Sequence, residues 1–242
     1  MKRFLTSATA SAAFMLSASV TLGRERGAIA VLAAMDSELS ALKKEAEIVG
    51  GSFEFDGRTV YQARCEGRPV LLAKTGATPE AARAITQWLV REREVSAVVS
   101  LGTAGSLNEG LQIGEVVVAR NALRDGNGQT TPWNLQEVTG CQAKSANMIV
   151  TVKAFVANGS ERARLRETYG ADMVDMSAAE IAEICATRHI PCVIIREISD
   201  RADEDAPRAF VETYRRKRPE AIQAAVCAVR QLKLDKASDE HQ

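Results

Sequence analysis

A series of short apolar runs, rich in β-branched residues, limits the possible folds more than any other feature of the chain. Each run is bounded by polar residues or glycine, a pattern typical of strands that are buried on both faces of a sheet. Segments with helical spacing of apolar residues separate most of the runs, and this alternation predicts an α/β fold with a parallel or mixed sheet. The runs comprise residues 28–34, 69–74, 95–101, 114–119, 148–156, 173–176 and 191–200.

The segments between the runs predict one hairpin and several helices. An alternating segment around Asp56-Gly57 carries the signal of a β-hairpin. After the first run, Asp36 or Ser37 is expected to cap a short helix. Residues 124–140 are polar and are expected to form a loop, and Pro219 is expected to break the helical segment near the C-terminus. The expected helices span residues 81–91, 161–169, 177–186 and 207–234.

Composition narrows the functional classes. The 242 residues are 46% apolar, which is sufficient for a full core and suits one large α/β domain. Lys and Arg together number 31, as do Asp and Glu, so the chain carries no net charge and lacks the basic surplus of a nucleic-acid-binding protein. The two histidines, His189 and His241, give poor support to a Ser-His-Asp or Cys-His mechanism.

The five cysteines are odd in number and widely spaced along the chain. They form no CxxC pair and no spacing typical of a metal site, so neither a disulfide nor a metal role is expected for any of them. Two of them lie in apolar segments and are interpreted as small core residues, namely Cys185 and Cys192. The other three are Cys65, Cys141 and Cys227.

The N-terminal residues 1–27 form a segment that differs from the rest of the chain. Lys2-Arg3 precede an apolar stretch rich in small residues, which is the pattern of a secretory signal peptide. Ser and Thr interrupt the stretch, so it makes a poor membrane span. If it is a signal, the protein is exported to a periplasm or secreted; if it is an unstructured extension, the protein is cytoplasmic. The globular domain is then expected over residues 28–234, with a frayed tail at 235–242.

Two strand ends carry groups that suit a functional site. The last apolar run ends in Asp200, and functional groups in open α/β sheets sit at the carboxyl ends of strands. Asp200 is therefore either a catalytic acid or the N-cap of the next helix. The run at 95–101 leads into Gly102-Thr103-Ala104-Gly105, where glycines let the backbone approach a ligand or simply form a tight turn. This stretch lacks the lysine of a phosphate-binding GxxxxGK[ST] loop.

Five motifs, taken together and in order, resemble the purine nucleoside phosphorylase/uridine phosphorylase superfamily, most closely its methylthioadenosine/S-adenosylhomocysteine nucleosidase branch. The resemblance implies a single-domain three-layer α/β/α sandwich around a twisted mixed sheet. It implies a small-molecule nucleoside substrate, no metal, no cofactor, no nucleic acid and a possible homodimer. The motifs are Ala34-Met35-Asp36-Ser37-Glu38, Gly102-Thr103-Ala104-Gly105, Gly114-Glu115-Val116-Val117-Val118, Val174-Asp175-Met176-Ser177 and Arg196-Glu197-Ile198-Ser199-Asp200.

The resemblance also implies an activity, which is hydrolysis of the N-glycosidic bond of an adenine nucleoside. Breaking this bond builds positive charge on the ribose and negative charge on the base, so the reaction needs a proton donor and a group that activates water. By resemblance, Asp200 is the proton donor, Glu38 activates the water and Arg196 helps to hold it. The implied substrate-binding residues are Thr103, Ala104 and Gly105 at the ribose and water site, Phe155 and Val156 at the base, and Asp175, Met176 and Ser177 at the sugar.

The chain departs from this family at three places. Ser177 stands where the family has a glutamate that accepts hydrogen bonds from the ribose hydroxyls, and the segment between Val118 and Ile149 is shorter. Val152-Lys153 replaces the family's Gly-Asp pair just before Phe155. Two alternatives therefore stay open beside the nucleosidase. One is a phosphate-dependent phosphorylase, for which Arg24, Arg26 and Lys74 are the candidate phosphate-binding groups. The other is a divergent member that binds a nucleoside without cleaving it.

Overall fold

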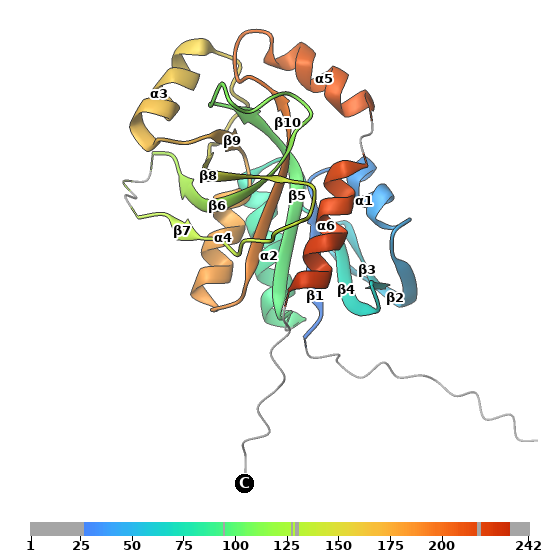
Figure 1. Ribbon diagram of the computed structural model, residues 1–242. Helices are drawn as coiled ribbons and strands as arrows, with labels where there is room; N and C mark the ends of the chain where they lie inside the picture. The colour runs from blue at the N-terminus through green and yellow to red at the C-terminus, as the bar shows by residue number, and fades with distance from the viewer. Residues whose placement is uncertain (1–26, 94, 127, 129–130, 217–218, 233–242) are drawn as a thin grey trace, which may run out of the picture.

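A computed structural model describes residues 27–93, 95–126, 128, 131–216 and 219–232. The predicted signal segment and the predicted tail at 235–242 lie outside the described residues, apart from Gly27. The described part forms one sheet packed between helices (Figure 1). It contains no helix that is long and apolar enough to cross a membrane.

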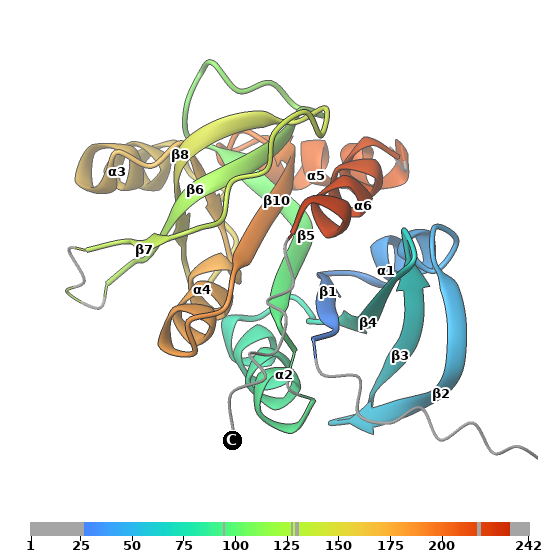
Figure 2. The same ribbon diagram turned by 60° about the horizontal axis from the view of Figure 1, so that its bottom comes forward.

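The sheet consists of a closed ring and an open extension that share strand β5. Strand β5 pairs with both β9 and β10, and the pairings β10–β6, β6–β8 and β8–β9 complete the ring. From β5 the sheet continues through β1 and β4 to the hairpin of β3 and β2, on the other side of the molecule (Figure 2). The strands are β1 (Ile29–Ala33), β2 (Glu47–Phe55), β3 (Arg58–Cys65), β4 (Arg68–Lys74), β5 (Ala97–Ser106), β6 (Val116–Arg124), β7 (Trp133–Asn134), β8 (Lys144–Thr151), β9 (Met173–Asp175) and β10 (Cys192–Asp200).

Helices cover both faces of the sheet, so the predicted three-layer α/β/α architecture is confirmed. Helices α2 (Pro79–Glu92) and α4 (Ala178–Thr187) pack on one face, and α1 (Asp36–Leu42) and α6 (Glu220–Gln231) pack on the other. Along β1, Ala30 and Leu32 join the first core, whereas Ile29 and Val31 join the second. A strand buried on both faces has no solvent side, which explains why the strands appear as unbroken apolar runs.

Most predicted secondary structure is confirmed, with shifts at the ends. Asp56 and Gly57 have φ of 49° and 70°, as the tight turn of a hairpin requires. Pro219 divides the C-terminal helical segment into α5 (Ala206–Arg216) and α6, as expected. The prediction that Asp36 or Ser37 caps α1 is wrong, because the N-cap is Met35. The expected strand at 148–156 is also displaced, since β8 ends at Thr151.

The prediction that no cysteine forms a disulfide is wrong. Cys141 and Cys227 are bonded, with their Cα atoms 5.5 Å apart and a sequence separation of 86. The bond joins the segment before β8 to α6 on one face of the sheet, an encounter that only the tertiary fold brings about. Spacing rules detect cysteines that lie close together in the sequence, so they do not detect this pair. The remaining cysteines are buried free thiols, as interpreted for Cys185 and Cys192.

Candidate active site

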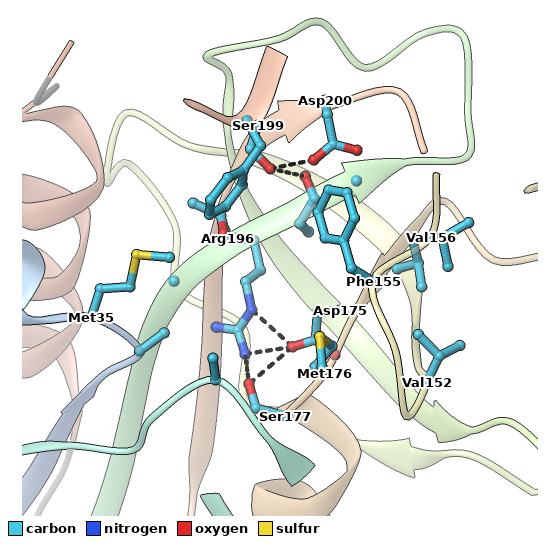
Figure 3. A pocket seen from close by; sticks show the side chains of 18 of the residues that line it. Met35, Val152, Phe155, Val156, Asp175, Met176, Ser177, Arg196, Ser199 and Asp200 are labelled. Atoms are coloured by element: carbon cyan, nitrogen blue, oxygen red, sulfur yellow. Dashed lines mark hydrogen bonds and ion pairs between the residues drawn. The ribbon is translucent and has the colours of Figure 1, made fainter. Parts of the chain in front are cut away.

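A cavity of about 340 Å³ opens at the carboxyl ends of the strands, where parallel α/β sheets commonly bind ligands (Figure 3). Its walls come from the ends of β1, β4, β5, β9 and β10, from the segment after β8, and from α5. The walls are mostly apolar, with polar groups gathered at two places. The lining residues are Ala34, Met35, Gly76, Ala77, Gly102, Thr103, Ala104, Gly105, Val152, Phe155, Val156, Val174, Asp175, Met176, Ser177, Arg196, Ser199, Asp200 and Phe210.

One polar place is the carboxyl group of Asp200, the last residue of β10. A bulge at Ser199 brings Asp200 level with Gly105 on β5. The Ala202 amide donates to Asp200 Oδ1 at 2.8 Å, and the Ser199 hydroxyl donates to Oδ2 at 2.7 Å. Asp200 is only 1% exposed. The alternative that it caps the next helix does not hold, because α5 starts only at Ala206.

The surroundings of Asp200 favour its protonated form. Burial raises the pKa of the Asp200 carboxyl above its usual range, and this outweighs the hydrogen bonds from Ser199 and Ala202, which lower it. No lysine or arginine is among the described residues that hydrogen-bond to Asp200. A carboxyl with a raised pKa in an apolar cavity is better suited to act as a general acid than an ordinary exposed aspartate.

The glycines of the 102–105 stretch lie inside β5 and form a cavity wall, not a tight turn. A Cβ atom on Gly105 would stand 2.8 Å from Asp200 Oδ1 and 3.1 Å from Ala202 Cβ. A Cβ atom on Gly102 would stand 3.3 Å from the Cβ of Ala34. The glycine at position 105 is therefore required because the Asp200 carboxyl occupies the space that a side chain would need.

The other polar place is a buried ion pair between Arg196 on β10 and Asp175 on β9. Arg196 Nε and Nη2 donate to Asp175 Oδ2 at 3.0 and 2.8 Å. Arg196 Nη2 also donates to Ser177 Oγ at 3.1 Å, as Figure 3 shows. The side chains of Arg196 and Asp175 are 1% and 3% exposed. Their charges compensate each other, so this end of the cavity is polar but nearly neutral.

Glu38 lies beside the cavity and does not line it. It borders a neighbouring hollow of about 410 Å³, and Thr103 lines both hollows. Glu38 Oε2 accepts the Met35 amide at 2.9 Å, so its carboxylate caps the first turn of α1. Burial raises the pKa of Glu38 from 4.5 to about 7, against the lowering effects of the Met35 amide and the positive charge of Arg196. A carboxyl with this pKa exchanges a proton near neutral pH, which suits a general base.

The comparison with known proteins identifies the family. A family model described as "Phosphorylase superfamily" matches residues 28–146 and 136–230, which is nearly all of the described chain. The chain belongs to the phosphorylase superfamily.

Similar members of the superfamily include nucleosidases. The chain is 27% identical over 216 residues to a 5′-methylthioadenosine/S-adenosylhomocysteine nucleosidase of Marinomonas sp., covering 76% of this chain and 90% of that protein. The structure of the nucleosidase of the same name from Neisseria meningitidis, in complex with methylthio-immucillin-A, matches with a TM-score of 0.77 and 25% identity, covering 85% and 99% of the two chains. The structure of futalosine hydrolase from Helicobacter pylori matches with a TM-score of 0.78 and 18% identity, covering 87% and 100%.

The cavity of this superfamily member brings together most of the residues that the sequence singled out. Every predicted substrate-binding residue lines it, and so do Asp200 and Arg196, whereas Glu38 does not. Among the described residues, no group of three or more His, Cys, Asp and Glu side chains could hold a metal ion. The predicted substrate-binding residues that line the cavity are Thr103, Ala104, Gly105, Phe155, Val156, Asp175, Met176 and Ser177.

Sequence reasoning missed several residues of the wall. Phe210 on α5 makes an edge contact with Phe155, with ring centroids 5.7 Å apart, and the two rings stand at the cavity rim. Phe155 is 45% exposed, so the rim presents an aromatic surface to an entering ligand. Thr213 on the same helix donates to the Ser199 carbonyl at 3.0 Å and holds α5 against β10. The amphipathic pattern of α5 was the only signal for Phe210, and such a pattern does not indicate what the apolar face contacts.

Proposed function

We propose that the protein hydrolyses the N-glycosidic bond of an adenine nucleoside, of the methylthioadenosine/S-adenosylhomocysteine type, and releases the free base. The observation that carries this proposal is the buried Asp200 carboxyl, with its raised pKa, at one end of an apolar cavity in a member of the phosphorylase superfamily. A purine is a poor leaving group unless a ring nitrogen accepts a proton as the bond breaks. Asp200 is the acid that the cavity offers for that proton.

In the proposed reaction, the C1′–N bond breaks and its electron pair goes to the purine. Asp200 gives its proton to a ring nitrogen of the departing base. The sugar carbon becomes electron-poor, and a water molecule adds its oxygen to C1′ while its proton passes to Glu38. Thr103 borders both the cavity and the hollow of Glu38, and it therefore stands where that water would sit. The products are the free base and the free sugar.

Water is favoured over phosphate as the acceptor of the glycosyl group. Among the described residues that line the cavity, Arg196 is the only basic one, and its N–H groups donate to Asp175, Ser177, Ser100 and Ile195. An anion such as phosphate would also meet the carboxylate of Glu38 when that group is ionised. The described part of the cavity therefore offers no basic group for phosphate beyond Arg196. Of the candidates named from the sequence, Lys74 pairs with Asp36, and Arg24 and Arg26 lie outside the described residues.

The choice of adenine nucleosides rests on relatives. The 27% identical relative and the Neisseria meningitidis structure are named for methylthioadenosine and S-adenosylhomocysteine. The Helicobacter pylori structure, of nearly equal similarity in fold, is named for futalosine. The aromatic rim of Phe155 and Phe210 is suited to stacking on a purine, whichever substituent the sugar carries.

The experiment measures free base released from methylthioadenosine, S-adenosylhomocysteine, adenosine and futalosine by chromatography, in buffer without phosphate. We expect release of adenine from at least one adenine nucleoside, and no acceleration when phosphate is added. The Asp200→Asn variant, purified in parallel, controls for a contaminating nucleosidase. Folded protein that releases no base from any of the four would refute the proposal, and phosphate-dependent formation of a sugar 1-phosphate would replace it with phosphorolysis.

A further inference from the structure

The hollow that Glu38 borders is much larger than a single water molecule requires. Its volume is about 410 Å³, whereas a water molecule takes up about 30 Å³ in the liquid. Leu101 and Thr103 on β5, Glu197 on β10 and residues in or beside α1, α5 and α6 surround it. The hollow therefore has room beside Glu38 for a molecule of several carbon and oxygen atoms.

The hollow and the cavity meet at a border formed by Met35, Glu38 and Thr103. Thr103 lines both spaces. Met35 lines the cavity, Glu38 lines the hollow, and the amide of Met35 donates to Glu38 Oε2 at 2.9 Å. A molecule in the hollow therefore reaches the proposed general base at the place where the cavity begins.

Asp200 and this border lie at different places along one pair of strands. In the pairing of β10 with β5, Asp200 is level with Gly105 and Glu197 is level with Thr103. Two residues of a strand span about 7 Å, and their side chains project from the same face. In the function proposed above, on which this inference rests, the C1′–N bond lies between the acid and the border, so the nucleophile approaches C1′ from the hollow.

The walls of the hollow combine polar and apolar surface. Ser37 and Ser40 contribute hydroxyl groups, and Ala41, Leu101 and Ile222 contribute apolar surface. Carboxyl groups outnumber cations, which disfavours an anionic ligand. Hydroxyl groups beside apolar surface suit a neutral carbon chain that carries several hydroxyls. The acidic and basic side chains of the wall are Glu38, Glu45, Glu197 and Lys44.

We propose that the hollow binds a neutral polyol and that the protein transfers the glycosyl group to this acceptor as well as to water. The C1′–N bond breaks, its electron pair goes to the base, and Asp200 supplies the proton that the base takes up. A hydroxyl oxygen of the polyol bonds to C1′, and its proton passes to Glu38. The products are the free base and an alkyl glycoside.

The acceptor is an alcohol and not an amine. A protonated amine is attracted by the carboxyl groups of the hollow, but it has no electron pair to offer C1′. After the transfer, Asp200 has lost a proton and Glu38 has gained one, so exchange with solvent restores both groups. The step needs no oxidant, reductant or metal ion.

The test offers glycerol as the acceptor, together with the nucleoside that the protein cleaves best, in buffer without phosphate. Free base, free sugar and glyceryl glycoside are measured by chromatography with mass detection over a range of glycerol concentrations. We expect the ratio of glycoside to free sugar to exceed the molar ratio of glycerol to water by about tenfold or more, because a bound acceptor has a high effective concentration. We also expect glycoside formation to level off as the hollow fills. A ratio that only follows the molar ratio, or no glycoside at all, shows that the hollow holds water only and overturns the inference.

A substitution in the wall of the hollow tests where the acceptor binds. Ala41→Leu on α1 fills part of the hollow and leaves the side chains of Glu38 and Thr103 in the chain. We expect it to lower the ratio of glycoside to free sugar by about tenfold or more. The exposed Ala186 on α4 lines neither the hollow nor the cavity, so Ala186→Leu is the matched control and should keep the wild-type ratio. An unchanged ratio in folded Ala41→Leu protein overturns the assignment of the hollow, and if that variant does not fold, the wild-type measurement decides the inference.

The outcomes separate this inference from the proposed function. A protein that releases base and free sugar but forms no glycoside retains the function and loses the acceptor site. A protein that releases no base, with or without glycerol, loses both. Release of base only in the presence of glycerol supports the acceptor site and removes water as the acceptor.

Discussion

Two buried aspartates border the same cavity and differ in what surrounds them. Asp175 faces Arg196 at 2.8 Å and accepts further bonds from Thr151, Ser177 and the first turn of α4. Among the described residues, Asp200 accepts one amide and one hydroxyl, and no lysine or arginine hydrogen-bonds to it. Burial acts on both carboxyls, but a charged partner compensates for it at one of them only. The same side chain is therefore a fixed part of the wall at one end, and at the other it is the proton donor of the function proposed above.

This comparison extends to the strands that carry the two residues. Asp175 ends β9, and only two residues separate it from α4, so its carboxylate is bound by a helix N-terminus as well as by Arg196. Asp200 ends β10 behind a bulge, and five residues separate it from α5. A carboxyl at the end of a strand can therefore either stabilise the fold or line a cavity. Which of the two it does depends on how soon the next helix begins.

The largest expected effect comes from removing the proton at Asp200. Asp200→Asn keeps the shape and accepts the Ala202 amide through its side-chain oxygen, but it cannot donate a proton as an acid. We expect kcat to fall about 10⁴-fold, the upper range for loss of a general acid, with a melting temperature close to that of the wild type. The measurement is steady-state hydrolysis of whichever nucleoside is cleaved best. A variant that keeps a tenth of the activity would remove the acid role from Asp200.

Removing the charge at Asp175 should act on stability first. Asp175→Asn leaves the Arg196 guanidinium buried without its counter-charge, and breaking such a pair costs about 3–5 kcal/mol. The measurement is the free energy of unfolding in urea. Asp36→Asn is the matched control, because the Asp36–Lys74 pair is exposed and should contribute less than about 1 kcal/mol. Equal effects of the two substitutions would show that Arg196 and Asp175 do not hold this end of the cavity.

Glu38 is a third carboxyl of interest, with a pKa of about 7 in the folded protein. Because this pKa lies above the unfolded value of 4.5, the protonated form stabilises the fold, and that stabilisation is lost as pH rises from about 4.5 through about 7. The loss corresponds to at most about 3 kcal/mol. We expect Glu38→Gln to remove it, so the unfolding free energies of variant and wild type should diverge between pH 5 and pH 8. If the unfolding free energies of variant and wild type instead change in parallel with pH, the Glu38 carboxyl is more exposed to solvent than a pKa of about 7 implies.

The pH profile of the reaction gives a second view of Glu38. As a general base it must be ionised, so we expect kcat/KM to rise with pH through an inflection near 7. An inflection near 4.5 would indicate that Glu38 is not the group that accepts the proton of water. Profiles of kcat/KM rather than kcat report the free enzyme, to which the pKa of about 7 refers.

The smallest effect concerns the space beside Asp200. Gly105→Ala places a Cβ atom 2.8 Å from Asp200 Oδ1, so the carboxyl must turn away from its hydrogen bonds. We expect a loss of kcat of about 10- to 100-fold and a loss of stability of about 1–3 kcal/mol. Gly51→Ala is the control, because nothing lies within 4 Å of the added atom. If Gly105→Ala retains full kcat, the position of the Asp200 carboxyl is less restricted than its hydrogen bonds suggest.

The sequence predicts the strands and helices that carry this site better than it predicts the contacts between the side chains within it. Apolar runs mark strands, so the placement of Asp200 at the end of β10 follows from local pattern, as does the break at Pro219. The partners of Asp175 come from β8, β10 and α4, and no spacing indicates that these meet. The position of Glu38 outside the cavity depends on how α1 packs on β4 and α6, which periodicity does not determine. Both features depend on contacts between segments that are distant in the sequence, and local patterns do not predict such contacts.

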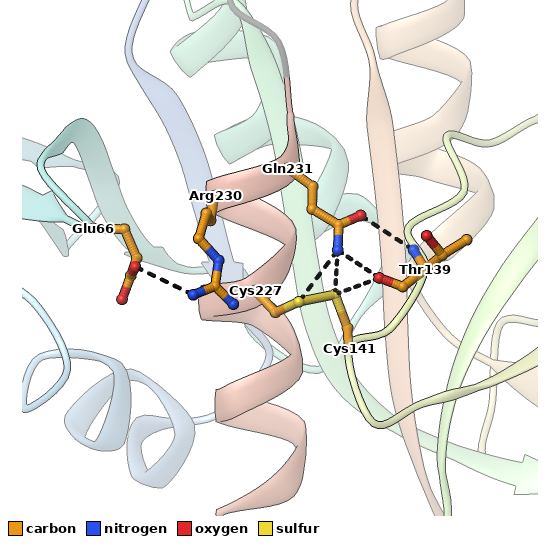
Figure 4. The surroundings of a disulfide bond; sticks show 6 residues. All are labelled: Glu66, Thr139, Cys141, Cys227, Arg230 and Gln231. Carbon is orange, nitrogen blue, oxygen red and sulfur yellow. Dashed lines mark hydrogen bonds and ion pairs between the residues drawn. A yellow bond between two sulfur atoms is a disulfide. The ribbon is translucent and has the colours of Figure 1, made fainter.

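Figure 4 shows the disulfide between Cys141 and Cys227. Because of this bond, the stability of the folded protein, and with it of the cavity, depends on whether the surroundings are oxidising. The loop that the disulfide closes, with a sequence separation of 86, includes β8, β9 and β10, and thus both aspartates. Closing a loop of this length restricts the unfolded chain and contributes about 4.6 kcal/mol in the chain-entropy model. That contribution exists only in an oxidising compartment. We propose that the protein is exported, and that in a reducing cytosol the same sequence would open, and be degraded by proteases, more often.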